Sequence, residues 1–78
     1  MFIKKTDLKK MAELLRGAPV LQLIPGGRAE LAGLQYGDII LEVNGVGVNS
    51  EYTYNDKYGD ILKVWRHGET FDVYVPIK

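Results

Sequence analysis

The 22 residues from Ile24 to Gly45, IPGGRAELAGLQYGDIILEVNG, constrain the fold of this chain more than any other stretch. Pro25-Gly26-Gly27 predicts a turn, because proline presets φ and glycine permits positive φ. Arg28 to Ala32 has the length of a short helix, and Gly33 stands where a glycine commonly ends a helix. The first half of the stretch therefore predicts a strand end, a glycine turn and a helical turn.

The second half of the stretch predicts a strand between two turns. Gly37-Asp38 indicates a turn in which the aspartate accepts local backbone N–H bonds. Ile39 to Val43 is mostly aliphatic and predicts a strand. Asn44-Gly45 is the dipeptide most typical of a two-residue hairpin turn, and Val46-Gly47-Val48 is expected to be the returning strand.

This order of turns, helix and strand resembles PDZ domains, especially those of bacteria. The family pattern is a Pro-Gly turn, an Ala-Gly-Leu segment, a Gly-Asp turn, an aliphatic strand and Asn-Gly. The residues that match it in order are Pro25, Gly26, Gly27, Ala29, Ala32, Gly33, Leu34, Gly37, Asp38, Ile39, Ile40, Val43, Asn44 and Gly45. The resemblance implies an α+β fold, a PDZ-like small and partly closed antiparallel β-sandwich with two or three short helices.

The resemblance also implies a peptide-recognition site. PDZ domains accept an extended peptide by β-augmentation between an edge strand and a helix, and backbone N–H groups of a glycine-containing loop hold its C-terminal carboxylate. We expect the circularly rearranged bacterial type, as one domain over residues 1–78. Its expected parts are a groove strand at 2–5, a connecting helix at 7–16, a central unit at 20–48, a groove helix at 51–58 and a C-terminal hairpin at 61–77.

Two departures from the family pattern affect the expected site. No glycine-containing loop precedes Phe2. That loop lies upstream if the chain is cut from a longer protein, and the carboxylate site is incomplete if Met1 is the natural start. Glu51 to Tyr58 is shorter than the usual groove helix and poor in helix formers, so we expect two turns at most, or an irregular loop. Such a groove would bind peptides weakly, or would be wider and accept something other than a free C-terminus.

Composition limits the class of protein. Seventy-eight residues, 46% of them apolar, suffice for one small domain. Ten basic and ten acidic residues cancel, so we expect no nucleic-acid partner. No apolar run reaches the roughly 18 residues that span a bilayer, so we expect no membrane insertion. We also expect the domain to be a monomer in isolation. The compartment stays open, and only the resemblance suggests the cell envelope or periplasm.

An amphipathic helix is predicted at Asp7 to Arg16, with Thr6 as its N-cap and Gly17 as its stop. Its apolar face is formed by Leu8, Met11, Ala12 and Leu15. The helix could bind a partner or pack on its own domain, and we favour packing on its own domain. The nearby lysines are interpreted as a solvated face rather than a binding patch; they are Lys4, Lys5, Lys9 and Lys10.

Three further strands are predicted. Val20 to Ile24 is nearly all apolar, so both of its faces are expected to be covered. Ile61 to Arg66 and Glu69 to Ile77 are expected to form a hairpin through the two-residue turn His67-Gly68, which fixes the register. The expected pairs are Arg66 with Glu69, Trp65 with Thr70, Val64 with Phe71, Lys63 with Asp72 and Leu62 with Val73.

This register divides the hairpin into a core face and an outer face. The core face is expected to carry Leu62, Val64, Phe71, Val73, Val75 and Ile77. On the outer face, Lys63 is expected to form an ion pair with Asp72. Trp65 lies on the same outer face, either packed under the N-terminal helix or exposed as a contact point.

We find no catalytic constellation and expect no enzyme. Ser50 is the only serine and His67 the only histidine, and their spacing does not indicate a Ser-His-Asp arrangement. An enzyme would need Asp38, His67 and Ser50 to converge in one pocket. A lone histidine without cysteine is a poor metal site, so we expect no metal and no cofactor.

The function that remains is recognition of a protein or peptide, which could be a C-terminus. The candidate peptide-binding residues are Phe2, Ile3, Lys4, Lys5, Tyr52, Tyr54 and Tyr58, since tyrosine is enriched at interfaces. Any single tyrosine could instead fill the gap left by the short helix. The resemblance implies a module of a larger bacterial protein, such as an envelope serine protease, a C-terminal processing protease, an intramembrane metalloprotease or a secretion component.

The alternative is a structural or assembly domain with a degenerate groove, which docks in cis on a partner domain and binds no free peptide. An open slot between residues 2–5 and 51–58 would support peptide binding. A slot filled by Tyr52, Tyr54 or the N-terminus would support the alternative.

Overall fold

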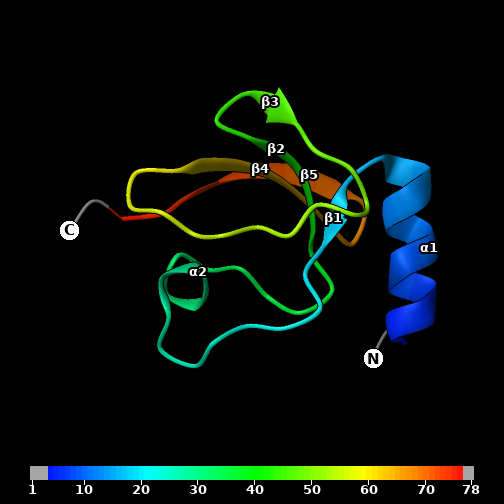
Figure 1. The fold of residues 1–78 in the computed structure, drawn as a ribbon, viewed down its shortest axis with the longest axis horizontal. Helices are drawn as coiled ribbons and strands as arrows, with labels where there is room; N and C mark the ends of the chain where they lie inside the picture. Colours follow the sequence, from blue (N-terminus) through cyan, green and yellow to red (C-terminus); the bar gives the residue numbers. More distant parts are fainter. Residues whose placement is uncertain (1–3, 77–78) are drawn as a thin grey trace.

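The fold is seen in a computed structural model that describes residues 4–76. Five strands form one antiparallel sheet in the order β1-β2-β4-β5, with β3 paired to β2 (Figure 1). This confirms the α+β arrangement of an antiparallel sheet with a few short helices. The elements are α1 (Lys5–Leu15), β1 (Ala18–Pro19), α2 (Arg28–Leu31), β2 (Ile39–Val43), β3 (Val46–Gly47), β4 (Ile61–Arg66) and β5 (Glu69–Tyr74). Among residues 4–76, neither helix has the length and hydropathy of a membrane-spanning segment.

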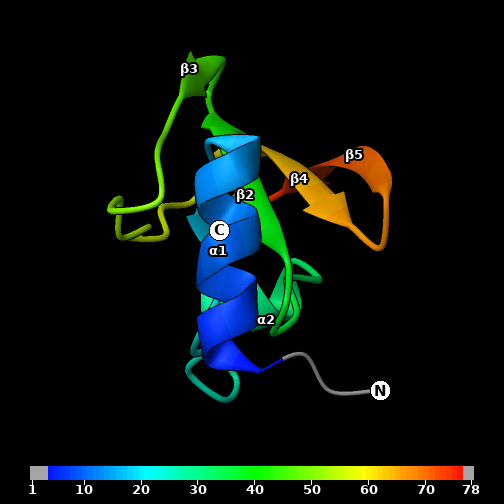
Figure 2. The same ribbon diagram turned by 90° about the vertical axis from the view of Figure 1, so that its right-hand side faces the viewer.

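Strand β2 is covered on both faces. Ile39 belongs to a cluster with Leu8 and Ala12 of α1, which lies in front of β2 in Figure 2. Ile40 belongs to the larger core on the other face. Successive side chains of a strand point to opposite faces, so two neighbouring isoleucines bury two separate clusters. The larger core consists of Ala18, Val20, Leu34, Ile40, Leu62, Val64, Val73 and Val75.

Both two-residue hairpin turns form as predicted. Asn44 and Gly45 have φ of 51° and 82°, and His67 and Gly68 have φ of 50° and 85°. Two consecutive positive φ angles are typical of the type I′ turn, whose twist suits a hairpin. The β4–β5 register is confirmed over all five predicted pairs. The predicted core face is also confirmed for the described residues, although Phe71 is only partly buried and Ile77 lies outside them.

The outer face of the sheet differs from the prediction in one contact. The Nζ atom of Lys63 lies 3.8 Å from Glu42 Oε2, so its ion pair is with β2 and not with Asp72. A lysine in a central strand has neighbours on two strands, and the sequence of the hairpin alone shows only one. Trp65 takes the first of its two predicted places and packs against the cluster of Leu8, Ala12 and Ile39.

Helix α1 begins earlier than predicted. The carbonyl of Lys4 accepts the N–H of Leu8 at 2.9 Å, so Lys4 is the N-cap and Thr6 lies inside the helix. The predicted strand at residues 2–5 is therefore wrong for Lys4 and Lys5, because the helical hydrogen bonds extend back to Lys4. Phe2 and Ile3 lie outside the described residues.

Gly17 serves packing at the end of α1. The left-handed C-cap is Arg16, with φ of 56°. A Cβ at Gly17 would lie 2.4 Å from Ile39 Cγ2 and 2.8 Å from the Ile40 carbonyl. The glycine predicted as a helix stop therefore lets α1 approach β2 closely.

Two predicted elements take an irregular form. The strand predicted at residues 20–24 does not form, and the chain leaves the sheet after β1. Val20 alone stays bonded near β2: its N–H donates to the Asp38 carbonyl at 2.8 Å, and its carbonyl accepts the Gly37 N–H at 3.2 Å. No helix occurs at residues 51–58, which form a loop, the second of the two forms considered for this segment. The tyrosines, threonine and asparagine of this loop explain why no helix forms.

Candidate functional site

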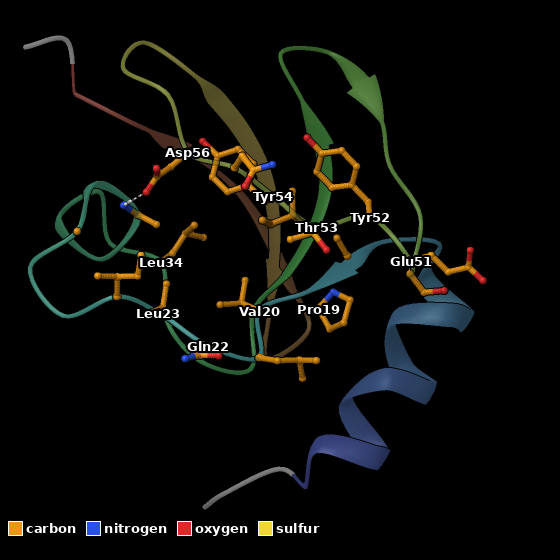
Figure 3. A pocket seen from close by; sticks show the side chains of 18 residues that line it. Pro19, Val20, Gln22, Leu23, Leu34, Glu51, Tyr52, Thr53, Tyr54 and Asp56 are labelled. Carbon is orange, nitrogen blue, oxygen red and sulfur yellow. Dashed lines mark hydrogen bonds between the residues drawn. The ribbon is translucent and has the colours of Figure 1, made fainter.

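An apolar pocket of about 570 Å³ lies between residues 18–24 and the loop at 50–56 (Figure 3). Val20, Leu23 and Leu34 line it from the side of the core, while Tyr52 and Tyr54 line it from the loop. Leu34 and Val20 are buried members of the main core, so the floor of the pocket is formed by core side chains. The remaining lining residues are Ala18, Pro19, Leu21, Gln22, Ile24, Gly27, Ala29, Ile40, Ser50, Glu51, Thr53, Asn55 and Asp56.

Both segments that border the pocket carry unpaired backbone groups. Leu21, Gln22 and Leu23 make no backbone hydrogen bond to any other described residue, whereas Val20 uses both of its groups. On the facing loop, the backbone groups of residues 53–55 are likewise without a partner within residues 4–76. An extended edge with free N–H and C=O groups is a template for pairing with another strand.

The loop is held at its far end by Asp56. Its Oδ2 accepts the Ala29 N–H at 3.2 Å, drawn as a dashed line in Figure 3. Its Oδ1 lies 3.5 Å from Arg28 Nε, and the Arg28 guanidinium lies 4.4 Å from the centre of the Tyr58 ring. These contacts join the loop to the start of α2 and fix one end of the pocket wall.

A buried carboxylate holds the loop from the sheet side. Asp60 accepts hydrogen bonds from Asn44 Nδ2 at 2.9 Å, from the Tyr54 hydroxyl at 2.7 Å and from the Lys57 N–H at 3.1 Å. Burial by itself would raise the pKa of Asp60, but these hydrogen bonds outweigh it and lower that pKa below its ordinary value. Burial and the bond to Asp60 raise the pKa of Tyr54. Tyr54 is therefore a fixed, uncharged part of the pocket wall.

The structure separates the residues predicted for the site. Tyr52 and Tyr54 line the pocket, and Tyr58 lies outside its lining against Arg28. Lys4 and Lys5 are at the start of α1 and are not among the lining residues. Phe2 and Ile3 lie outside the described residues.

The pocket also contains residues that the sequence analysis did not single out. The main ones are the backbone of residues 21–23 and the side chains of Leu34 and Ile40. The run from Val20 to Ile24 was expected to be covered on both faces, and it lies beside a segment too poor in helix formers to cover it. An apolar segment beside a segment that forms no helix to cover it is the pattern in the sequence that could have predicted this pocket.

The candidate catalytic residues do not form a constellation. Ser50 lines the pocket, His67 is in the β4–β5 turn, and no hydrogen bond among the described residues joins either to Asp38. Asp38 accepts the Gln35 N–H at 2.9 Å, as predicted for a turn aspartate, and also pairs with Arg66 at 2.7 Å. Within residues 4–76 no three His, Cys, Asp or Glu side chains are grouped as metal ligands would be.

Comparison with known proteins relates the chain to a protein family and to a bacterial protein. A family model described as PDZ domain matches residues 20–66. A protein of Hahella chejuensis (strain KCTC 2396), named probable periplasmic serine endoprotease DegP-like, is 39% identical over 69 residues. That match covers 80% of this chain and 15% of the Hahella protein, so the chain spans only a small part of the length of this relative.

Proposed function

The chain belongs to the PDZ domain family, whose members are non-catalytic protein-interaction modules, and from this premise we propose that it binds an extended peptide in the pocket between residues 18–24 and 50–56. The peptide adds as a strand along residues 21–23. The observation that carries the proposal is the unpaired backbone of Leu21, Gln22 and Leu23 beside an open apolar pocket.

The direction of the free groups follows from Val20. Its N–H and C=O both bond toward the Gly37–Asp38 turn. In an extended chain, backbone groups alternate between the two edges, so those of Leu21, next to Val20, point to the opposite, open edge. A peptide strand there gains backbone hydrogen bonds, and its alternate side chains enter the pocket over Leu34 and Val20.

The test is an NMR titration of the isotope-labelled 78-residue chain with short apolar peptides. We expect chemical-shift changes at the amides of residues 21–23 and 52–55, and none on α1 or at the outer edge of β5. We expect a dissociation constant in the micromolar to millimolar range, because the few contacts of one short peptide must offset the conformational entropy that the peptide loses on binding.

A matched pair of variants locates the binding surface. Thr53 lines the pocket and is exposed, so Thr53→Trp would fill the entrance without disturbing the core and should abolish the shifts. Thr70 is also exposed, on β5, and does not line the pocket, so Thr70→Trp should leave the shifts unchanged. No shifts at millimolar peptide would contradict the proposal and favour a domain that docks in cis on a partner domain.

The name of the Hahella relative suggests where such a module would act. If this domain serves a periplasmic protease, the pocket would hold substrate segments or a part of a neighbouring domain. Because the chain matches only 15% of that relative, this host is itself part of the proposal. Fusion of the chain to the protease portion of such a relative, assayed with and without Thr53→Trp, would test recruitment.

A further inference from the structure

We propose that the pocket selects an internal apolar segment flanked by basic residues, and not a free C-terminus. This inference rests on the proposed function, since it names the class of peptide that the same pocket takes. It follows from three features of the described lining: the lack of a cation, the lack of converging N–H donors, and an unpaired carboxylate at the rim.

The pocket offers no cation to a peptide carboxylate. Its described lining contains no lysine, arginine or histidine. The nearby Arg28 is occupied, because its Nε lies 3.5 Å from Asp56 and its guanidinium stacks on the Tyr58 ring. A C-terminal carboxylate would therefore lose its hydration in the pocket without gaining an ionic partner.

The pocket also lacks a backbone cradle for an anion. Several N–H groups pointing to one place can hold a carboxylate, and glycine-rich turns usually supply them. Gly27 is the one glycine of the described lining, and its N–H already donates to the Ile24 carbonyl at 2.9 Å. The unpaired N–H groups of the described lining are divided between residues 21–23 on one wall and 53–55 on the other, which suits a strand lying between the walls more than an anion held at one point.

The charge at the rim favours a cation on the peptide. Glu51 lines the pocket at the Pro19 end, and Figure 3 shows its carboxylate directed outward on the side of α1. No ion pair within residues 4–76 involves this carboxylate. Asp56 marks the other end, where Arg28 is its ionic partner at 3.5 Å and the Ala29 N–H donates to it at 3.2 Å, so its charge is already offset. A lysine or arginine flanking the apolar core of a peptide at the Pro19 end would be attracted by the Glu51 carboxylate, and an acidic residue there would be repelled.

The experiment compares peptides that share one apolar five-residue core. The first is acetylated and amidated with lysine at both ends, and the second has glutamate at both ends. A third and a fourth carry lysine at the N-terminal end only and stop at the last apolar residue, one as the free acid and one as the amide. Affinity is measured by NMR titration of the full chain at low and at high salt.

We expect the lysine-flanked peptide to bind about threefold more tightly than the glutamate-flanked one, the size that one exposed ion pair supplies. The preference should shrink at high salt, because exposed pairs are screened. The amide should bind at least as tightly as the free acid. Glu51→Gln should reduce the preference for lysine, and Glu69→Gln, an equal change of charge on β5 outside the pocket, should preserve it.

Three outcomes decide between this inference and the function beneath it. Tighter binding of the free acid, or equal binding of the two flanked peptides, would overturn the inference and leave the proposed function standing. Binding by none of the four peptides would overturn both. Preference for lysine and indifference to the carboxylate would support both.

Discussion

Asp60 is a carboxylate that the fold buries to 7% exposure and surrounds with hydrogen-bond donors from three parts of the chain. Asn44 of the first hairpin turn, Tyr54 of the pocket wall and the Lys57 N–H of the loop all donate to it. Asn44 also accepts the Ile61 N–H at 2.9 Å through its side-chain oxygen. One aspartate thus joins the pocket loop to the sheet.

The stability of the fold should depend on the charge of Asp60. Its pKa in the fold lies below the ordinary 3.8, so the charged form is favoured by folding. The resulting stabilisation is complete at pH well above 3.8 and is lost as the pH falls through the lowered pKa. We expect Asp60→Asn to lower the free energy of unfolding by about 1–3 kcal/mol near neutral pH, and by less in acid.

Urea denaturation of wild type and Asp60→Asn at several pH values between neutral and strongly acidic would measure this. Asp72→Asn, at an exposed position of β5, is the control and should change stability little at any pH. A difference between wild type and Asp60→Asn that stays constant down to low pH would show that the loss comes from packing and not from charge.

At the scale of elements, Arg66 ties the end of β4 to the turn before β2. Its Nε and Nη2 each donate to Asp38 at 2.7 Å, and Nη2 also donates to the Gly33 carbonyl at 2.8 Å. Its guanidinium lies 4.7 Å from the centre of the Phe71 ring. Because Asp38 is 1% exposed, this arginine is the partner of a fully buried charge.

Arg66→Met should cost about 3–5 kcal/mol of unfolding free energy, because it leaves the buried carboxylate of Asp38 unpaired. Lys63→Met is the matched control: the Lys63–Glu42 pair spans 3.8 Å at the surface, and its loss should cost about 1 kcal/mol or less. Both values are measured by chemical denaturation. Similar losses in the two variants would mean that the Asp38 pair is no more important than a surface contact.

The local elements of this fold could be predicted from the sequence because short-range chemistry decides them. Asn44-Gly45 and His67-Gly68 determine tight turns, and each turn sets the register of the strands beside it. Contacts between strands that are distant in sequence could not be predicted in this way. The register shift between Ile40 and Glu42, and with it the pairing of Lys63 with Glu42, depends on how β2 meets β4.

On the scale of the whole molecule, the pocket was the part least accessible to sequence analysis. Its two walls are separated by some thirty residues, and the Asp56 contacts that join them involve α2. The family resemblance directed attention to the loop that lines the pocket, through Tyr52 and Tyr54. It placed the facing strand at residues 2–5, where Lys5 is helical, while the free backbone edge of the described chain is at residues 21–23.

This free edge leads to a prediction about amide exchange across the whole domain. In the dilute free chain, the amides of Leu21 and Leu23 should exchange with solvent orders of magnitude faster than those of β4, although they adjoin the buried Val20. Saturation with a bound peptide should slow exchange at residues 21–23 and leave the outer edge of β5 unchanged, because strand addition protects only the edge that it covers. Hydrogen exchange followed by NMR measures both states. Slow exchange at Leu21 and Leu23 in the free chain would contradict the prediction. If that slow exchange persisted on dilution, another part of the same chain would cover the edge; if dilution made it fast, a second copy of the chain would cover it.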